Sequence, residues 1–451
     1  PLTVNSKINL NDGGDSVFIG TNAGLNDDLS NNRNVGVGVN ALQSNTTGAD
    51  NTANGANSLT ANTTGTFNTA NGSNSLRFNT TGGSNVANGY QALRANTTGA
   101  FNTATGRDAL LKNTIGNWNT ANGISALQSN TTGEENTANG SDTLYSNTTG
   151  NNNVANGSYA LYLNTTGNYN TANGAYALFS NTTGQLNTAN GYLSLNSNTT
   201  GTDNTANGGN ALRTNTTGIG NVANGSNALR GNTTGNNNVA NGSSTLYSNT
   251  TGSNNVANGS EAGRYIANKS TAATILNNSV LLGWRTSPLA DNETNQIVIG
   301  YDATGNGSNT VTLGNTSITK TVLRGDISGS VFSGSFVGDG SQLTGISGGG
   351  TPFPYTGSAQ ITGSLGVTGS LDILSGSISL IDDQENTLIG KNIFSTAKGA
   401  INQSVVIGLD AAKNDTSTGT NSEGNVVIGY RAAENHNGEQ SVYIGALSGY
   451  L

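Results

Sequence analysis

The chain has 451 residues, of which 9% are charged and 65 are glycine, whereas a globular protein has about 25% charged residues and about 7% glycine. The absence of cysteine excludes disulfides and thiolate chemistry. The formal net charge of −8 disfavours a nucleic-acid partner, because phosphate binding needs a basic surface. No apolar run approaches the ~20 residues that cross a bilayer, so we expect no membrane insertion within this chain.

The N-terminal region, residues 1–33, reads as a cap with one apolar coil. Its central motif is Ser-Val-Phe-Ile-Gly, from Ser16 to Gly20. Alternating apolar residues that end at glycine are typical of a short β-strand followed by a corner.

Residues 34–270 form a regular array with a period of 17 residues. Asn-Thr-Thr-Gly occurs thirteen times in phase, from Asn45 to Asn249, with one variant at Asn113. A second element, Asn-Thr/Val-Ala-Asn-Gly, lies between these copies, and a leucine follows its glycine by four residues in most coils. Two glycine corners and β-branched residues without helical periodicity predict one coil of a parallel β-solenoid. Thirteen coils at ~4.8 Å spacing give a rod about 60 Å long.

Equivalent residues of successive coils should stack in columns. Alternation places Thr or Val and the next-but-one Asn on one face of the strand and the intervening Ala on the other. We expect a structural ladder of stacked asparagines and leucines, beginning with Asn54, Asn71, Asn88, Leu59, Leu76 and Leu93. A coil this small and polar is expected to bury little Ala and Leu surface alone, so these columns should meet inside an oligomer, which we predict to be a homotrimer.

The remaining chain divides into three further segments. Residues 271–325 carry the apolar motif at irregular spacing and are expected to form irregular coils of the same solenoid. Residues 326–380 read as a Gly/Ser-rich β connector, because apolar residues alternate there among frequent glycines. The motif returns in residues 381–451, which we expect to form C-terminal coils.

These motifs resemble those of known fibrous proteins. The [S/T/Q]-[V/I]-x-[I/L]-G motif resembles the head repeat of trimeric autotransporter adhesins, and the 14-residue step from Gly300 to Gly314 matches that coil length. The segment from Phe336 to Ile346 resembles a motif of phage tail fibres, and the array resembles tail-fibre repeat proteins. The resemblance implies an all-β, left-handed parallel β-roll, with chains intertwined or side by side in a parallel homotrimer. Where the adhesin heads have an apolar residue before the glycine, most coils here have Asn, so the coil interior should be more polar.

No residue pattern indicates catalysis, a cofactor or a metal. The single histidine, His436, lies in a polar stretch without a serine and acid partner pattern. Aromatic residues recur beside the leucines and could stack against sugar rings or simply against one another; these are Tyr145, Tyr162, Phe179, Tyr159, Tyr176 and Tyr247. A second set follows the Asn-Thr-Thr-Gly turn and should be exposed or packed between protomers: Phe67, Phe101, Trp118 and Tyr169. Arg77 and Arg94 share a column one coil apart and should splay into solvent.

The sequence therefore predicts a non-enzymatic fibre shaft on a cell surface, in an extracellular appendage or on a virion, which projects an adhesive or receptor-binding end. One alternative is an adhesin that binds cell-surface glycan through the aromatic columns. A second is an ice-binding solenoid, which the regular threonine columns suggest and the Thr/Val mixture disfavours.

Overall fold

The computed structural model describes residues 15–28 and 30–321, together with the short segments 387–389, 401–402, 405–407, 422–423, 426–428 and 442–445. The chain divides into two compact units, Pro1–Ser328 and Gly329–Leu451. All elements in the described residues are β-strands, and none is a helix. The predicted connector at 326–380 and His436 lie outside the described residues.

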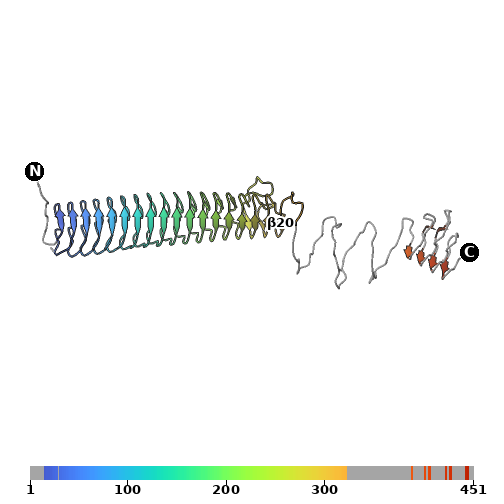
Figure 1. Ribbon diagram of the computed structural model, residues 1–451, viewed down its shortest axis with the longest axis horizontal. Coiled ribbons are helices and arrows are strands. Elements are labelled where there is room, and N and C mark those ends of the chain that lie inside the picture. Colours follow the sequence, from blue (N-terminus) through green and yellow to red (C-terminus); the bar gives the residue numbers. More distant parts are fainter. Residues whose placement is uncertain are drawn as a thin grey trace. The chain divides into compact units, whose positions relative to one another are not determined.

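The first unit is a parallel β-solenoid with about 17 residues per turn. Its main sheet contains 18 strands, one from each coil, and they stack in a single row (Figure 1). Every neighbouring pair is parallel and in register; Thr171 of one coil, for example, pairs with Thr188 of the next. The prediction of a parallel β-solenoid with tandem 17-residue coils is confirmed.

Each strand of the sheet has three residues. The N-terminal strands are β1 (Val17–Ile19) and β2 (Val35–Val37), and the C-terminal ones are β17 (Val280–Leu282), β19 (Ile297–Ile299) and β20 (Val311–Leu313). Between them lie the strands of the array: β3 (Thr52–Asn54), β4 (Thr69–Asn71), β5 (Val86–Asn88), β6 (Thr103–Thr105), β7 (Thr120–Asn122), β8 (Thr137–Asn139), β9 (Val154–Asn156), β10 (Thr171–Asn173), β11 (Thr188–Asn190), β12 (Thr205–Asn207), β13 (Val222–Asn224), β14 (Val239–Asn241) and β15 (Val256–Asn258). A second ladder joins β16 (Leu276–Asn277) to β18 (Glu293–Thr294).

The second unit repeats the same pairing on a smaller scale. Four parallel strands follow one another in its larger sheet: β21 (Thr387–Ile389), β23 (Val405–Ile407), β25 (Val426–Ile428) and β26 (Val442–Ile444). A two-stranded parallel sheet joins β22 (Ile401–Asn402) to β24 (Ser422–Glu423).

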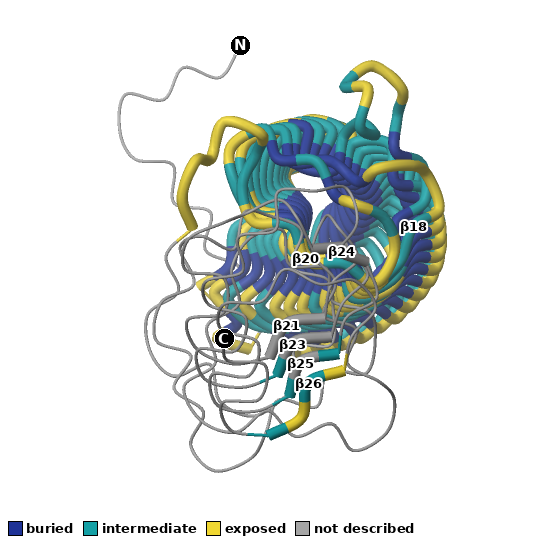
Figure 2. The backbone as a smooth tube through the Cα atoms, turned by 90° about the vertical axis from the view of Figure 1, so that its right-hand side faces the viewer, coloured by how far each residue is buried: buried dark blue, intermediate teal, exposed yellow. Residues whose placement is uncertain are grey.

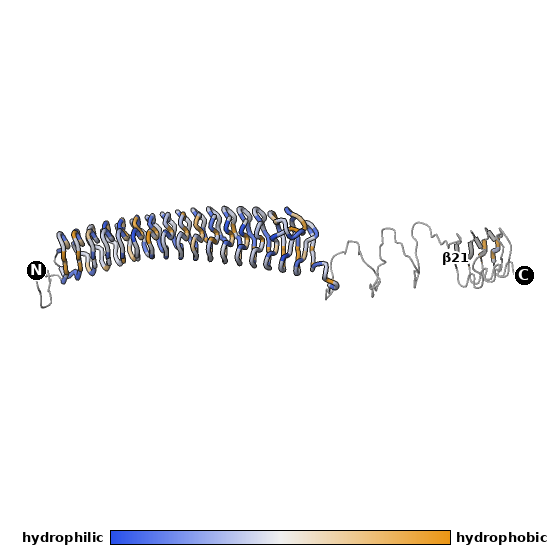
Figure 3. The backbone as a smooth tube through the Cα atoms, turned by 90° about the horizontal axis from the view of Figure 1, so that it is seen from above, coloured by the Kyte–Doolittle hydropathy of each residue, from blue (hydrophilic) through white to orange (hydrophobic). Residues whose placement is uncertain are grey.

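The core runs along the inside of the coils of the first unit. The central residue of each strand points inward, and in the array this alanine is fully buried, as Ala172 illustrates. Leu178 of the same coil is also fully buried, and so are the equivalent leucines from Leu42 to Leu246. Buried segments line the inside of the stack (Figure 2), and hydrophobic stretches recur from coil to coil (Figure 3).

Each buried leucine enters the core from a left-handed turn. Leu161 has φ 52° and Leu178 has φ 52°, a conformation that costs a side chain other than glycine roughly 1–2 kcal/mol. The turn directs the leucine side chain inward, where it gains about 1.5–3 kcal/mol from burial. The same strained turn therefore recurs in every coil of the array because it supplies the main apolar contact.

One expectation about the interior is wrong, and the reason given for another is wrong. The Ala and Leu columns do not need a second chain to be buried, because both are fully buried within a single chain. The Asn before each glycine does not make the interior polar, since it lies on the outer side of the strand; Asn71, for example, is exposed. The interior is polar for another reason, which is two different columns of asparagine.

Candidate functional site

Two columns of asparagine run through the interior of the array. One contains the first residue of each Asn-Thr-Thr-Gly turn, and the other contains the residue just before each strand; members of both, such as Asn181 and Asn187, are fully buried. Asn181 Nδ2 donates to Asn164 Oδ1 of the preceding coil at 2.8 Å and to the Gly184 carbonyl at 3.0 Å. The same arrangement recurs one coil later, where Asn198 Nδ2 donates to Asn181 Oδ1 at 2.8 Å.

The second column is bonded just as completely. Asn187 uses both its backbone N–H and its side-chain Nδ2 to donate to Asn170 Oδ1, each at 3.1 Å. Its Nδ2 also donates to the Gly201 carbonyl at 2.9 Å. Because the amide groups of these columns bond to one another and to backbone carbonyls, with Asn232 Oδ1 the exception, the asparagines have a structural role.

The predicted ladder residues lie in two different places. Leu59, Leu76 and Leu93 are fully buried in the core. Asn54, Asn71 and Asn88 lie on the outer face of the sheet, where Asn71 Nδ2 donates to Asn88 Oδ1 at 2.9 Å. The buried asparagine columns were missed, although their signal was present: three asparagines occur in nearly every coil of the array, and all three positions are nearly invariant.

Five of the six predicted aromatic residues form one cluster. Tyr145, Tyr162 and Phe179 stack in one column, with ring centroids 5.1 Å and 5.2 Å apart. Tyr159 and Tyr176 stack beside them at 5.2 Å. Tilted contacts of 5.6 Å and 5.7 Å join the two columns, Tyr159 to Tyr162 and Tyr176 to Phe179.

This packing leaves few ring faces open. Tyr162 has a ring on each side of it and another against its edge. Burial, with smaller effects from neighbouring Tyr145 and Asp142, raises the pKa of its phenol, so it stays protonated at neutral pH. The cluster presents ring edges and hydroxyl groups rather than a row of open faces. Stacking of this kind stabilises adjacent coils.

Tyr247 lies apart from that cluster, between two arginines. The Arg230 guanidinium lies 5.3 Å from its ring centroid and donates to its hydroxyl at 2.6 Å. The Arg264 guanidinium lies 5.1 Å from the same Tyr247 ring centroid, and it pairs with Glu261 at 2.6 Å. Arginines therefore satisfy Tyr247 from within the chain.

The paired arginines of the early coils behave in the same way. Arg77 and Arg94 lie 5.2 Å and 5.4 Å from the ring centroid of Phe78, which separates the two like charges. The expectation that they splay into solvent is wrong, because the aromatic ring provides a favourable cation–π contact for each.

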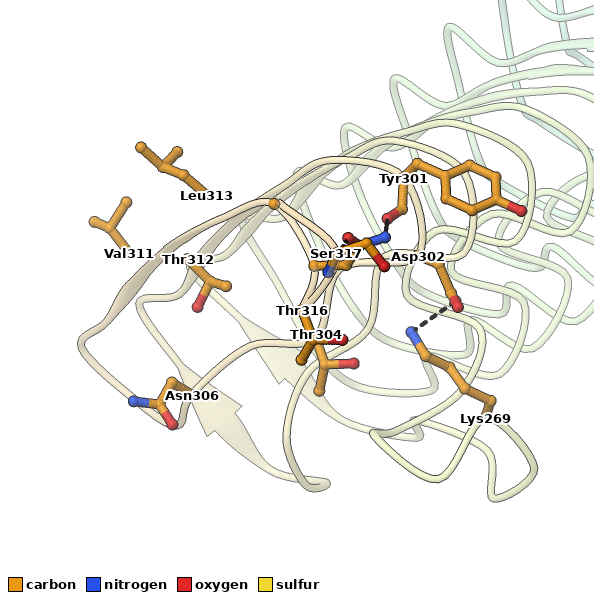
Figure 4. A pocket seen from close by; sticks show the side chains of 12 residues that line it. Lys269, Tyr301, Asp302, Thr304, Asn306, Val311, Thr312, Leu313, Thr316 and Ser317 are labelled. Carbon is orange, nitrogen blue, oxygen red and sulfur yellow. Dashed lines mark hydrogen bonds and ion pairs between the residues drawn. The ribbon is translucent and has the colours of Figure 1, made fainter. Parts of the chain in front are cut away.

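A hollow lies at the C-terminal end of the described coils of the first unit (Figure 4). It has a volume of about 840 Å³ and is lined by the last described coil, including Tyr301, Asp302 and Thr312. Lys269 pairs with Asp302 there at 3.2 Å and donates to Ser287 Oγ at 2.8 Å. Burial lowers the pKa of Lys269, and Asp302 partly opposes this. Its lining includes Val311, Thr312 and Leu313 of β20, the last described strand of the main sheet.

Charged side chains are absent from the buried interior of the described residues. Their buried polar side chains are Asn, Ser, Thr and Gln, and no three His, Cys, Asp or Glu side chains lie together as metal ligands in this part of the chain. The described part of the chain also contains no helix long and apolar enough to span a membrane. No protein-family model matches the chain, and no curated protein matches its sequence. The exposed side chains on the outer surface of the solenoid are therefore the groups that a partner could contact.

Proposed function

We propose that this chain is a non-enzymatic structural protein that forms the shaft of a fibre, on a cell surface, in an extracellular appendage or on a virion. It would hold an adhesive or receptor-binding end away from the surface that carries it. The observation that supports this most directly is the unbroken parallel ladder of 18 strands. At ~4.8 Å per strand such a ladder is about 80 Å long.

Stiffness follows from how the coils are joined. Each array coil is bonded to its neighbours through backbone groups and through buried amide side chains; the Thr171 N–H, for example, donates to the Asn187 carbonyl at 2.8 Å. Bending the rod would stretch several of these bonds in every coil on one side. Such a structure suits a spacer, because it holds its two ends at a fixed distance.

We further propose a left-handed coil and a parallel homotrimer, as the resemblance to adhesin heads and tail fibres implies. Since the core is complete within one chain, the chains would meet through their outer faces. Light scattering of the full chain, combined with electron microscopy, tests both parts of the proposal. A mass of three chains with thin rods at least about 80 Å long is expected, and a compact monomer would contradict it.

Glycan binding through the aromatic cluster has weaker support, because the rings cover one another's faces. An adhesin of this kind should bind in a glycan array and lose binding in the variants Tyr145→Ala and Tyr162→Ala. Binding that survives both substitutions would leave the cluster as a structural element.

Ice binding has one specific observation in its favour. The outer face of the sheet carries straight columns of Thr or Val and of Asn, repeated from coil to coil. In the proposed trimer the chains would also meet through outer faces, so association and ice binding would compete for this surface. A monomer that inhibits ice recrystallisation at micromolar concentration would favour ice binding over the shaft.

A further inference from the structure

The outer face of the sheet is wider than the three-residue strands. In the coil of β4, burial alternates from Phe67 to Asn71: Phe67 is exposed, Asn68 and Ala70 are buried, and Thr69 and Asn71 lie toward solvent. Ser73 follows Gly72 at the far edge. We call the column of residues equivalent to Phe67 the leading column and that equivalent to Ser73 the trailing column, and together with the strands they form the strand face.

The strand face is uncharged along its whole centre. None of the outward residues of the 18 strands is Asp, Glu, Lys or Arg. At the C-terminal end these residues are apolar and exposed, as at Ile297 (37%), Val311 (64%) and Leu313 (47%). Ile19 (50%) and Val35 (39%) show the same at the N-terminal end. A sheet face that stays in water usually carries charged residues among its outward positions.

Large apolar side chains border this centre on both edges. The leading column contains exposed Phe67, Phe101, Trp118, Tyr169 and Leu186. The trailing column contains exposed Val39, Tyr90, Ile124, Tyr192 and Tyr301. The two columns also contain charged residues, such as Asp50, Glu135 and Arg107, and the array strands between them carry Thr or Val and Asn. Exposed large apolar side chains gathered along one face are typical of an interaction site.

We propose that a second copy of this chain covers the strand face, in parallel and coil for coil, so that the leading column of one chain meets the trailing column of its neighbour. The proposal rests on the proposed homotrimer and adds which surface and which residues meet. Symmetry supplies the pairing. When identical rods are related by rotation about an axis along their length, equal heights stay level, and one edge of each face meets the opposite edge of the next.

The side chains of the two edges fit this pairing. In three coils a large side chain on one edge meets a small one on the other: Phe67 with Ser73, Tyr90 with Ser84, and Tyr169 with Ala175. In the coils of β7 and β11 both edges are large, as Trp118 with Ile124 and Leu186 with Tyr192. No coil of the first unit carries a charge on both edges, so coil-for-coil pairing brings no like charges together. An antiparallel arrangement would match coils of different height and lose this correspondence.

The available area is sufficient. A face about 80 Å long and about 20 Å wide, from seven residues at ~3.3 Å each, offers roughly 1,600 Å² per chain. A stable interface needs about 800 Å² from each partner. The face can therefore hold two neighbours, one at each edge, as a trimer requires.

Cysteine cross-linking tests the pairing directly, because the chain has no cysteine of its own. The test variant carries Asn152→Cys in the leading column and Ser158→Cys in the trailing column of the β9 coil. Asn152 has φ 57°, and other coils place Phe or Trp at this position with a similar φ. The extended strand Val154–Asn156 lies between the two positions and alone spans about 10 Å, whereas a disulfide needs Cα atoms less than about 7 Å apart. A disulfide can thus form only between chains.

Under mild oxidation, the double variant should give covalent trimers on a non-reducing gel, whereas either single variant should remain monomeric on it. A matched control combines Ser158→Cys with Ser146→Cys, which lies on the return stretch two residues after buried Leu144, and should not cross-link. Circular dichroism confirms that each variant is folded.

The outcomes separate this proposal from the function it rests on. A trimer by light scattering without cross-links in the double variant would overturn the strand face while leaving the trimeric shaft. Cross-linking of a single variant would indicate an antiparallel arrangement and overturn the coil-for-coil pairing. A monomer by light scattering would remove both proposals.

Discussion

The regular array and the coils that flank it fill the same interior in different ways. In the array, the inward strand residue is small and a large residue follows six positions later, as with Ala172 and Leu178. In the flanking coils the order is reversed. Phe18 is paired with Gly24, where a Cβ atom would lie 2.5 Å from the Phe18 ring, and Leu281 is paired with Ser287.

The comparison shows that most coils hold about one large side chain at these two positions, and that it can occupy either of them. The β15 coil is an exception, with Ala257 and Gly263, and there the Leu246 side chain of the preceding coil lies where a Cβ atom of Gly263 would be. Val298 of the β19 coil is followed six residues later by Thr304, which fits the same rule.

In the β2 coil the small residue is Gly36 and the large one is Leu42, six residues later. Gly36 faces the Phe18 ring of the preceding coil, so a large side chain would not fit there. Interior volume, rather than a fixed sequence, is what successive coils share.

The two regions also differ in their polar contacts. The asparagine column through Asn181 continues to Asn249, and the next coil places Ala273 at the equivalent position. The ladder ends one step earlier, because Asn249 Nδ2 donates to the Gly252 carbonyl and Asn232 Oδ1 has no hydrogen-bond partner. Beyond this point the coil length varies, because paired residues are 24 apart from Val256 to Val280 and 14 apart from Ile297 to Val311. Amide ladders require identical neighbours, which explains why the array keeps a constant 17 residues and the flanking coils do not.

Moving the large residue from one side to the other tests the volume rule and should have the largest effect. Leu178→Ala should destabilise the protein by about 2–5 kcal/mol through the cavity it leaves. Ala172→Leu alone should cost about 1–3 kcal/mol through overpacking. The double variant should lose less than the sum of the two, because it copies the arrangement of Leu281 and Ser287.

Urea unfolding of the four proteins gives the coupling free energy. Additive losses would mean that the two positions do not share one interior space.

The amide ladder should show the next largest effect. Asn181→Ala removes the donor to Asn164 Oδ1 and the acceptor for Asn198 Nδ2. Each buried polar group left without its partner costs about 1–3 kcal/mol, so the urea midpoint should fall clearly. A loss below about 0.5 kcal/mol would mean that water or a neighbouring group replaces the amide.

The sequence predicted the stack but not the assignment of its asparagines. A strict period and glycine corners are sufficient for a parallel solenoid, because any coil that repeats without insertions must stack on itself. Alternation placed Thr171 and Asn173 on the same face, but it did not determine that this face is the outer one. That depends on the left-handed turn at Leu178, which reverses the direction of the next side chains.

The aromatic cluster was partly predictable for the same reason. Tyr145, Tyr162 and Phe179 share one coil position, so their stacking follows from the period. The contact between Tyr159 and Tyr162 does not, because the two lie on either side of Leu161, whose φ of 52° bends the chain between them. Leucine is usually found at negative φ, so the sequence gives no sign that Leu161 forms a left-handed turn.

A smaller effect is expected one residue away from the amide ladder. Thr182 Oγ1 donates to the Thr199 carbonyl at 3.1 Å, but that carbonyl also accepts the backbone N–H groups of Thr182 at 2.9 Å and Thr183 at 3.3 Å. Thr182→Ala should therefore cost less than about 1 kcal/mol. As Asn181 and Thr182 are adjacent in one turn, the pair of variants compares buried and partly buried ladders in the same coil. A larger loss from Thr182→Ala than from Asn181→Ala would contradict the assignment of the buried ladder.

The smallest expected effect is a difference in acid stability between the two regions. Burial raises the pKa of Asp291, but hydrogen bonds outweigh it and hold the pKa below its usual value; Asp291 Oδ1 accepts from the Thr274 and Ile275 N–H groups at 2.8 Å each. A carboxylate with a lowered folded pKa contributes stability above its unfolded pKa and loses it as the pH falls through the folded value. As the pH falls below about 4, the ordinary pKa of an aspartate, and through the lower folded value, amide hydrogen exchange corrected for its intrinsic rate should therefore accelerate around residues 274–295. The array should stay protected, because its buried polar residues are Asn, Ser and Thr, which do not titrate in this range. Asp291→Asn should remove the pH dependence near Thr274 and leave the array unchanged, whereas equal acceleration in both regions would mean that acid acts on a contact the two regions share.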